Sequence, residues 1–194
     1  WAFRPLIRLA HEAGDRAKVV ALGERAAALP FDPAERRAFL VAAAEHAPEE
    51  RAIGLYRDLF DEAPGDRDVA ARLFALHEGR GEGDALIAIR GQQIDTASDP
   101  RERVELRLDL AARLAAAKRG DAAVVVLRTS LAESPGDDAT VTALGDLLEA
   151  EGQLADLAAL WEEEAARREA LGDGNGAATA WTRAAVVSER RLGD

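Results

Sequence analysis

The sequence predicts an all-α protein, a right-handed α-solenoid of about five helical hairpins followed by one unpaired helix. Two recurring segments indicate this repeat. The turn Pro64-Gly65-Asp66 returns 71 residues later at 135–137, and the segment 32–36 returns 67 residues later at 99–103 with Asp, Pro, Glu and Arg in the same places. The two displacements differ by four residues, which is about one turn of helix. We therefore expect a one-turn insertion in the helix that begins within 99–103.

Anchor positions on the second helix of each hairpin recur at about half of this long period. Their spacings are 33, 34, 37 and 34 residues, at Val19, Ala52, Leu86, Ala123 and Leu157. A period near 34 with two helices per unit resembles the tetratricopeptide (TPR) repeat. The fifth unit matches the TPR pattern of Leu-Gly, aromatic, Gly, small and aromatic residues at Leu144, Gly145, Leu148, Gly152, Leu157 and Trp161. The second unit adds Ala52, Tyr56 and Pro64 at the small, aromatic and proline positions.

The resemblance covers nearly the whole chain and implies a single TPR-like repeat domain. The expected units span about 1–31, 32–65, 66–98, 99–136 and 137–172, followed by a half unit at 173–194. The chain begins without Met and within an apparent helix. We interpret it as a fragment of a longer chain.

The first two hairpins are indicated by their turns and caps. Gly14-Asp15 separates helices expected over 1–13 and 16–28. Asp32 is a good N-cap and Pro33 a good first helical residue for the next helix, which runs to about His46. Its partner is expected to begin at Pro48 and to end before Pro64-Gly65.

The remaining helices follow the same alternation of apolar segments and Gly or Pro breakers. They are expected over 66–79, 83–96, 99–118, 121–133, 137–151, 153–170 and 177–191. The run Val124-Val125-Val126 is the best strand candidate, and its repeat register favours helix. Aromatic side chains fall at positions of the repeat core, at Tyr56, Phe60, Trp161 and Trp181.

The last helix has no partner helix after it in the sequence. In a solenoid each unit buries its apolar face against its neighbours. We therefore expect Trp181, Val186 and Val187 to present apolar surface to another segment or another chain. Homo- or hetero-assembly through the terminal helices is one way to cover that surface.

Composition excludes several classes of function. The formal net charge is −11, from 36 acidic and 25 basic residues, and only Lys18 and Lys118 are lysines. This balance opposes nucleic-acid binding, which requires clustered Lys and Arg. No apolar run approaches the roughly 20 residues that span a bilayer, so no membrane insertion is expected. The chain has no Cys, which fits cytoplasm or periplasm. Its Ala- and Arg-rich composition indicates a bacterial source.

No arrangement of residues predicts catalysis. The histidines, His11, His46 and His77, lie in three hairpins without the spacing of metal ligands. No serine sits in a Gly-x-Ser-x-Gly turn, and the Gly-rich turn at 79–83 lacks the phosphate-binding pattern. The acidic run 162–164 is interpreted as a solvated helix face. We therefore expect no enzyme activity, no cofactor and no metal.

The resemblance implies that the first helix of each hairpin lines a concave groove that accepts an extended or helical peptide. The predicted stripe is basic near the N-terminus, at Arg4, Arg8, His11 and Arg37, and acidic near the C-terminus, at Asp146 and Glu149. Between these ends it carries small or apolar residues at Val41, Ala71, Ala75, Leu108 and Ala112. A partner with one acidic and one basic end would fit. The alternative is that these are ordinary solvent-exposed charges.

The favoured hypothesis is a non-catalytic protein–protein interaction scaffold. A structural segment of a larger assembly, joined through its ends, is a second hypothesis. A regulatory repeat domain of a larger enzyme or sensor is a third. TPR domains that clamp a terminal carboxylate depend on Asn and Lys in their first helices. The only Asn is Asn175, in a predicted loop, which argues against that subclass.

Overall fold

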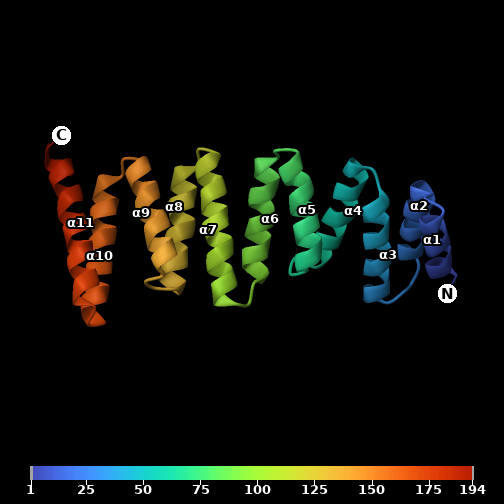
Figure 1. Ribbon diagram of the computed structural model, residues 1–194, viewed down its shortest axis with the longest axis horizontal. Coiled ribbons are helices and arrows are strands. Elements are labelled where there is room, and N and C mark those ends of the chain that lie inside the picture. Colours follow the sequence, from blue (N-terminus) through green and yellow to red (C-terminus); the bar gives the residue numbers. More distant parts are fainter. Residues whose placement is uncertain (1, 194) are drawn as a thin grey trace. The chain divides into compact units, whose positions relative to one another are not determined.

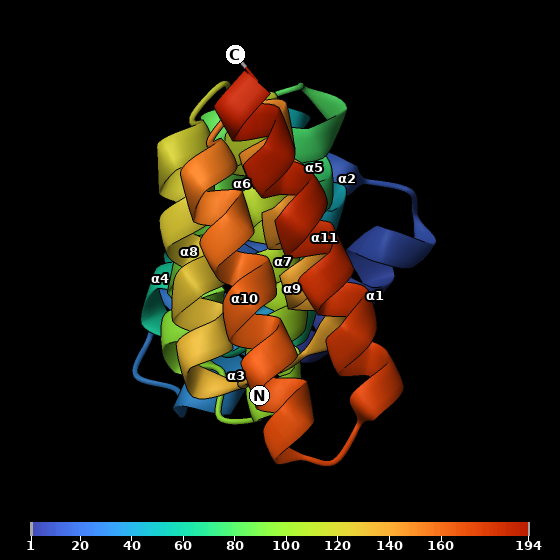
Figure 2. The ribbon, with the colours of Figure 1, turned by 90° about the vertical axis from the view of Figure 1, so that its left-hand side faces the viewer.

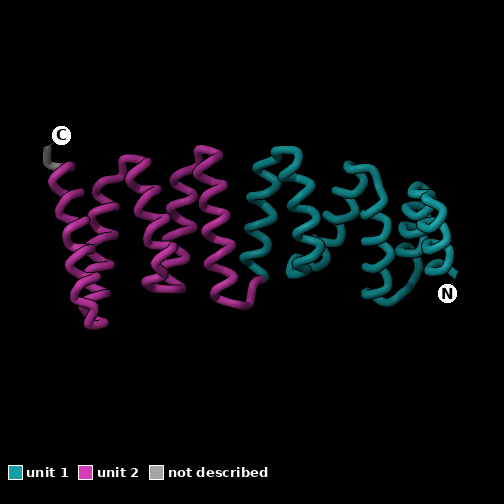
Figure 3. Tube along the Cα trace, in the orientation of Figure 1, with its two compact units in different colours: residues 1–96 teal, residues 97–194 magenta. Residues whose placement is uncertain are grey.

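The computed structural model describes residues 2–193, and its secondary structure there is entirely helical apart from turns. Helical packing divides the chain into two compact units, residues 1–96 and 97–194 (Figure 3). The first unit contains α1 Phe3–Glu12, α2 Arg16–Ala27, α3 Pro33–His46, α4 Glu49–Glu62, α5 Arg67–Gly79 and α6 Gly83–Thr96. Each helix packs against the next along the chain (Figure 1).

The second unit contains five helices. They are α7 Pro100–Ala116, α8 Gly120–Glu133, α9 Asp138–Ala150, α10 Leu154–Ala170 and α11 Gly174–Gly193. Successive helices pack together, α7 also contacts α9, and α11 lies along α10 in both views (Figures 1 and 2). The prediction of an all-α repeat of helical hairpins, of the solenoid class, is confirmed. The boundary near residue 97 falls at the expected junction of the third and fourth repeats. The single-domain organisation stays a prediction.

Among α1 to α10, five helices begin with an aspartate side chain. Each carboxylate accepts a hydrogen bond from a backbone N–H in the first turn, which has no partner within the helix. The caps are Asp15, Asp32, Asp66, Asp99 and Asp137. Pro follows the cap in α3 and α7, as the sequence predicts.

Turns within four of the hairpins share one backbone geometry. After α1 the residue Gly14 has φ +71°, and the next N–H, from Asp15, donates to the carbonyl of Ala10. This is the hydrogen bond of a Schellman C-cap, which requires a left-handed residue. The same position in the α7–α8 turn is Lys118, with φ +57°, and Arg119 there donates to Leu114. The turn is therefore retained where its glycine is not.

The first helix α7 is longer than the first helices α3, α5 and α9. α7 has 17 residues, whereas α3 has 14 and α5 and α9 have 13 each, as the one-turn insertion predicts. α11 begins earlier than the sequence analysis expected. The carboxylate of Asp173 accepts a hydrogen bond from the N–H of Gly176 at 2.9 Å, which caps the first turn and draws Gly174 and Asn175 into the helix.

The core of the first unit is built from helices α3 to α6. Its largest fully buried side chains are Phe60, Leu73 and Ile89, and Tyr56 is buried beside them, as expected for repeat-core positions. A smaller cluster joins α1, α2 and α3 through the rings of Phe3, Phe31 and Phe39. In the second unit the Val run 124–126 is helical, with Val124 buried and Val125 exposed.

Candidate functional site

The predicted groove stripe lies on open surface in both units. None of its positions on the first helices is buried: the basic, small and acidic members are each exposed or half-buried. This exposure is compatible with a stripe along one face of each first helix, and its role as a groove stays a prediction. Which of its charges are available to a partner depends on the ion pairs described next.

The basic residues of α1 are engaged within the first unit. Arg4 donates to Glu35 of α3 at 2.9 Å, and Arg8 lies 3.6 Å from Glu12 on its own helix. His11 Nδ1 lies 2.8 Å from Nε2 of His46, the last residue of α3. These contacts tie α1 to α3 and reduce the charge that α1 offers to a partner.

Arg37 forms an ion pair with Asp66. Its guanidinium makes two hydrogen bonds to the carboxylate of Asp66, one of them through Nη2 at 2.9 Å. Asp66 also caps α5 by accepting from the N–H of Val69 at 3.2 Å. The Arg37 hydrogen bond lowers the pKa of Asp66, and the same contact raises the pKa of Arg37. Arg37 therefore links α3 to the start of α5.

A groove in the second unit is lined by residues of two predicted surfaces, the acidic end of the stripe and the apolar face of the last helix. It has a volume of about 370 Å³ and lies between α9, α10 and α11. Asp146 and Glu149 of the acidic stripe line one wall, and Val186 and Val187 of the last helix line the other. Residues 146 and 187 are about forty positions apart, and the repeat stacking makes them neighbours.

The groove has mixed chemistry. Glu149 is paired with Arg190 of α11 at 2.7 Å, and the guanidinium of Arg183 lies 4.5 Å from the centre of the Trp161 ring. Asp146 has no hydrogen-bond or ion-pair partner among the described residues. One carboxylate therefore stays open beside an apolar and aromatic surface. Trp161 itself rests on Gly145, where an added Cβ would lie 2.9 Å from the ring.

The three end residues differ in exposure. Trp181 and Val186 are 42% and 43% exposed, whereas Val187 is 6% exposed and packs inward. The expectation that Trp181 lies in the core is wrong, because the buried face of α11 consists of Ala177, Ala180, Ala184 and Val187. Trp181 lies one position beyond that stripe, and its Nε1–H donates to Glu169 of α10 at 2.9 Å.

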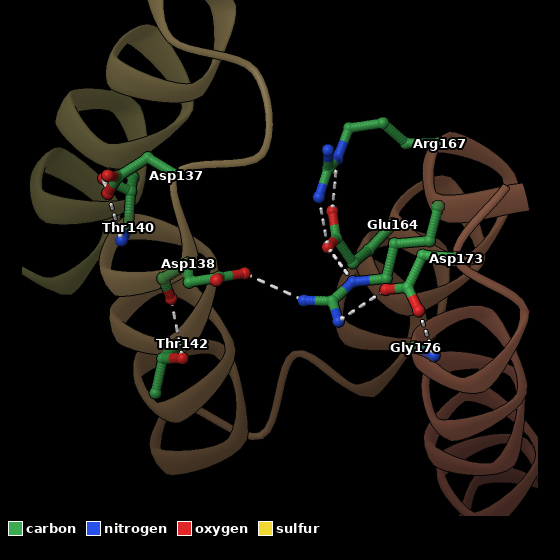
Figure 4. Close-up of polar contacts among 9 residues, drawn as sticks. Asp137, Asp138, Thr140, Thr142, Glu164, Arg167, Asp173 and Gly176 are labelled. Atoms are coloured by element: carbon green, nitrogen blue, oxygen red, sulfur yellow. Dashed lines mark hydrogen bonds and ion pairs between the residues drawn. The ribbon is translucent and has the colours of Figure 1, made fainter. Parts of the chain in front are cut away.

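The acidic run 162–164 is only partly solvated, which corrects the sequence interpretation. Glu162 and Glu163 are exposed, but Glu164 is 5% exposed. Figure 4 shows its carboxylate facing the guanidinium of Arg167, whose Nη2 donates at 2.7 Å. Arg168 also donates to Glu164 and reaches Asp138 of α9 at 2.8 Å. Basic residues three and four positions later were the signal for this cluster.

A second carboxylate is clamped in the same unit. Glu133, at the end of α8, accepts two hydrogen bonds from Arg107 at 2.8 and 2.6 Å and one from Arg103 at 3.1 Å. These contacts, with Arg107 the larger cause, lower the pKa of Glu133 to about 2. Arg103 and Arg107 both belong to α7, so this cluster joins the two helices of one hairpin.

Neither a metal cluster nor a membrane span is found in the part of the chain that the structure describes. Among residues 2–193, no three or more His, Asp or Glu side chains come together where they could hold a metal ion. No helix in the same range has the length and hydropathy needed to cross a membrane.

Comparison with known proteins identifies similar folds among solved structures. No protein-family model and no curated protein matches the chain. A Podospora anserina protein described as a kinesin light chain with nearly identical TPR-like repeats is 17% identical, with TM-score 0.48, covering 84% of this chain and 91% of that one. MamA is 13% identical, with TM-score 0.44, covering 86% of this chain and 100% of that one. BtubC from P. vanneervenii is 16% identical, with TM-score 0.41, covering 100% of this chain and 94% of that one.

The hairpins of this chain are TPR-like. This description rests on the order of the helices, on their spacing near 34 residues and on the shared turns.

Proposed function

We propose that this chain is a non-catalytic scaffold that binds a peptide or helix of a partner protein along the first helices of its hairpins. The observation that supports the proposal is the groove of the second unit, where Asp146, Glu149, Val186 and Val187 line one surface. These residues belong to two separate predictions. Their meeting in one groove is what a binding surface between adjacent repeats requires.

The chemistry of this groove suits a short peptide segment. Its volume of about 370 Å³ falls within the roughly 300–1,000 Å³ of typical binding sites. Trp161 and Val186 offer apolar contact, and the open carboxylate of Asp146 offers one oriented charge. Because helices form the walls, the groove needs little ordering when a partner binds. A partner segment with an apolar side chain next to a basic one is the expected match.

A peptide array tests the proposal. The full chain is incubated with a cellulose-bound array of random dodecapeptides, and binders are compared for Asp146→Lys and Val186→Asp. Each change should weaken binding of basic, apolar peptides about tenfold, because charge reversal and a buried charge both oppose the contact.

Matched variants in the same unit serve as controls. Glu163→Lys reverses an exposed charge outside the groove, and Val125→Asp changes an exposed valine of α8. Both should leave the bound peptides unchanged. If the control variants weaken binding as much as Asp146→Lys and Val186→Asp do, or if the array retains no peptide, the groove is not the binding surface.

Assembly through α11 is a second candidate function, favoured by the exposed side chains of Trp181 and Val186. Light scattering on chromatographic peaks of the chain and of Trp181→Glu would test it. A parent that self-associates beside a monomeric variant supports assembly. Monomers in both samples reject it.

A further inference from the structure

A recess in the first unit has the chemistry of a second binding site. It lies where α3, the start of α4 and α5 meet, with a volume of about 560 Å³. Alanines and Leu76 form its apolar wall, at Ala44, Ala47, Ala52 and Ala75. Four polar side chains, Glu45, Glu49, Tyr56 and Arg72, also line it. Glu49 is paired with Arg80 at 3.8 Å. Only Ala75 of these residues belongs to the predicted stripe.

Tyr56 is the first unusual feature of this recess. The residue is 4% exposed, and its hydroxyl has no hydrogen-bond partner among the described residues. Among all the described residues, the one fully enclosed side-chain oxygen or nitrogen without a partner is Ser130 Oγ, in α8 of the second unit. The hydroxyl of Tyr56 is not enclosed in this way. The Tyr56 hydroxyl therefore reaches the open space of the recess. A largely buried hydroxyl left without a partner is costly, so such a group points to something that binds there.

Glu45 and Arg72 are the second feature. Both are exposed, and neither forms an ion pair or a hydrogen bond with a described residue. Neighbouring arginines behave differently: Arg36, Arg37 and Arg51 each hold a carboxylate. Two opposite charges therefore stay open in the recess that Tyr56 also lines.

The environment also keeps the phenol protonated. Burial is the main cause that raises the pKa of Tyr56, the carboxylate of Glu45 adds to it, and Arg72 opposes it. The Tyr56 hydroxyl is thus an O–H donor at neutral pH. The recess then presents two donors, the phenol and the guanidinium of Arg72, and one unpaired carboxylate acceptor, that of Glu45.

We propose that this recess binds an extended peptide segment of a partner protein, with a backbone amide held between Glu45, Tyr56 and Arg72. A peptide N–H donates to Glu45, and the neighbouring C=O accepts from Tyr56 and Arg72. The alanines let a main chain approach closely, and a small apolar side chain packs on Leu76. Because the two open charges cancel, the site favours a neutral dipole over a phosphate or a cation. The assignment rests on the proposed scaffold function and adds a site in the other unit.

The chain carries its own reporter for this test. Tyr56 is the only tyrosine, so 3-fluorotyrosine labelling gives a single ¹⁹F resonance at the site. Dodecapeptides that the full chain retains on the random array are titrated into the labelled chain. At least one class should shift the resonance, and its members should share a small apolar residue.

Conservative variants measure the contribution of each group. Tyr56→Phe removes only the hydroxyl and should weaken those peptides about fivefold, as the loss of one hydrogen bond does. Arg72→Gln and Glu45→Gln should each weaken them about tenfold, because hydrogen bonds to charged groups are stronger. Arg25→Gln and Glu50→Gln are the matched controls, since both residues are exposed and lie outside the recess. A thermal melt establishes that each variant is folded.

The outcomes separate this inference from the scaffold proposal. Peptides that depend on Tyr56 and Arg72 and bind Asp146→Lys unchanged support the recess. Peptides that depend on Asp146 but never shift the Tyr56 resonance overturn the recess and leave the scaffold function standing. Unchanged binding to Tyr56→Phe, Glu45→Gln and Arg72→Gln also overturns it. An array that retains no peptide overturns both.

Discussion

The two units share the hairpin and one arginine–glutamate pair between its helices, Arg36–Glu62 and Arg103–Glu133, but others of their ion pairs differ. In the first unit, charged residues of the first helices tie one hairpin to the next: Arg4 reaches Glu35, and Arg37 reaches Asp66. In the second unit, the two multi-arginine clusters centre on second helices, at Glu133 and Glu164. Asp146 on a first helix is left open.

This difference shows that the sequence position of a charge predicts its face but not its availability. The predicted basic end of the stripe is on the surface and is nevertheless engaged. Its partners are about thirty residues away, in the next hairpin. The acidic end keeps an open carboxylate because no arginine of α11 is placed to pair with Asp146 as Arg190 pairs with Glu149.

The largest expected effect concerns the Glu164 cluster. Glu164→Ala should lower the free energy of unfolding by about 3 kcal/mol, because two arginines lose a buried carboxylate. Asp66→Ala should lower the free energy of unfolding by about 1–2 kcal/mol. It removes a helix cap and an ion pair that is more exposed than the Glu164 cluster. Urea denaturation followed by circular dichroism measures both. Equal costs would contradict the contrast between the units.

Close helix contacts provide a second test. In α2 an added Cβ at Gly23 would lie 2.7 Å from the backbone oxygen of Phe39, whereas at Gly145 it would meet the Trp161 side chain. Gly23→Ala should therefore lower the free energy of unfolding by about 2 kcal/mol and Gly145→Ala by about 1 kcal/mol. The reason is that a side chain can move aside more easily than a backbone.

Gly54→Ala in α4 is the control for both glycine changes. Apart from its own stretch of helix, no atom lies within 4 Å of its added Cβ, so the change should stabilise the protein by about 0.5–1 kcal/mol through helix propensity. The same urea titration measures it. A cost at Gly54 as large as that at Gly23 would show that close approach is not the cause.

The pH dependence of stability tests the Glu133 clamp. Its pKa is lowered from 4.5 to about 2 in the folded chain. A carboxyl with a lowered folded pKa stabilises the protein above its unfolded pKa, and this contribution is lost as the pH falls through the folded value. The urea midpoint of the wild type should therefore exceed that of Glu133→Gln at pH 6. The difference should shrink between about pH 4.5 and about pH 2. A constant difference across this range would argue against the clamp.

The smallest effects are expected at the exposed pairs of α1. Arg4→Ala and Arg8→Ala should each change the free energy of unfolding by less than about 0.5 kcal/mol, because exposed ion pairs contribute little. Chemical denaturation of the two single variants and the double variant measures this. A loss well above 1 kcal/mol for Arg4→Ala would show that its pair with Glu35 holds α1 in place.

The sequence predicted the features that depend on local chemistry. Asp32 and Pro33 specify a helix start within a few residues, and the apolar period assigns the face of each first helix. Features that depend on the neighbouring hairpin were not predicted. Tyr56 was correctly expected in the core, but the recess that it shares with Glu45 of α3 and Arg72 of α5 was not predicted. Glu164 was misjudged because its burial depends on how α10 packs.

The length of α7 limits how this chain can change by insertion. A helix rotates about 100° per residue, so four added residues turn its end by about 400°, only about 40° beyond a full turn. The turn at Lys118 therefore still directs α8 back onto the apolar face of α7. One or two added residues would rotate that turn by about 100–200° and direct α8 away from it. A deletion of four residues from α7 should therefore be tolerated where a deletion of two would not.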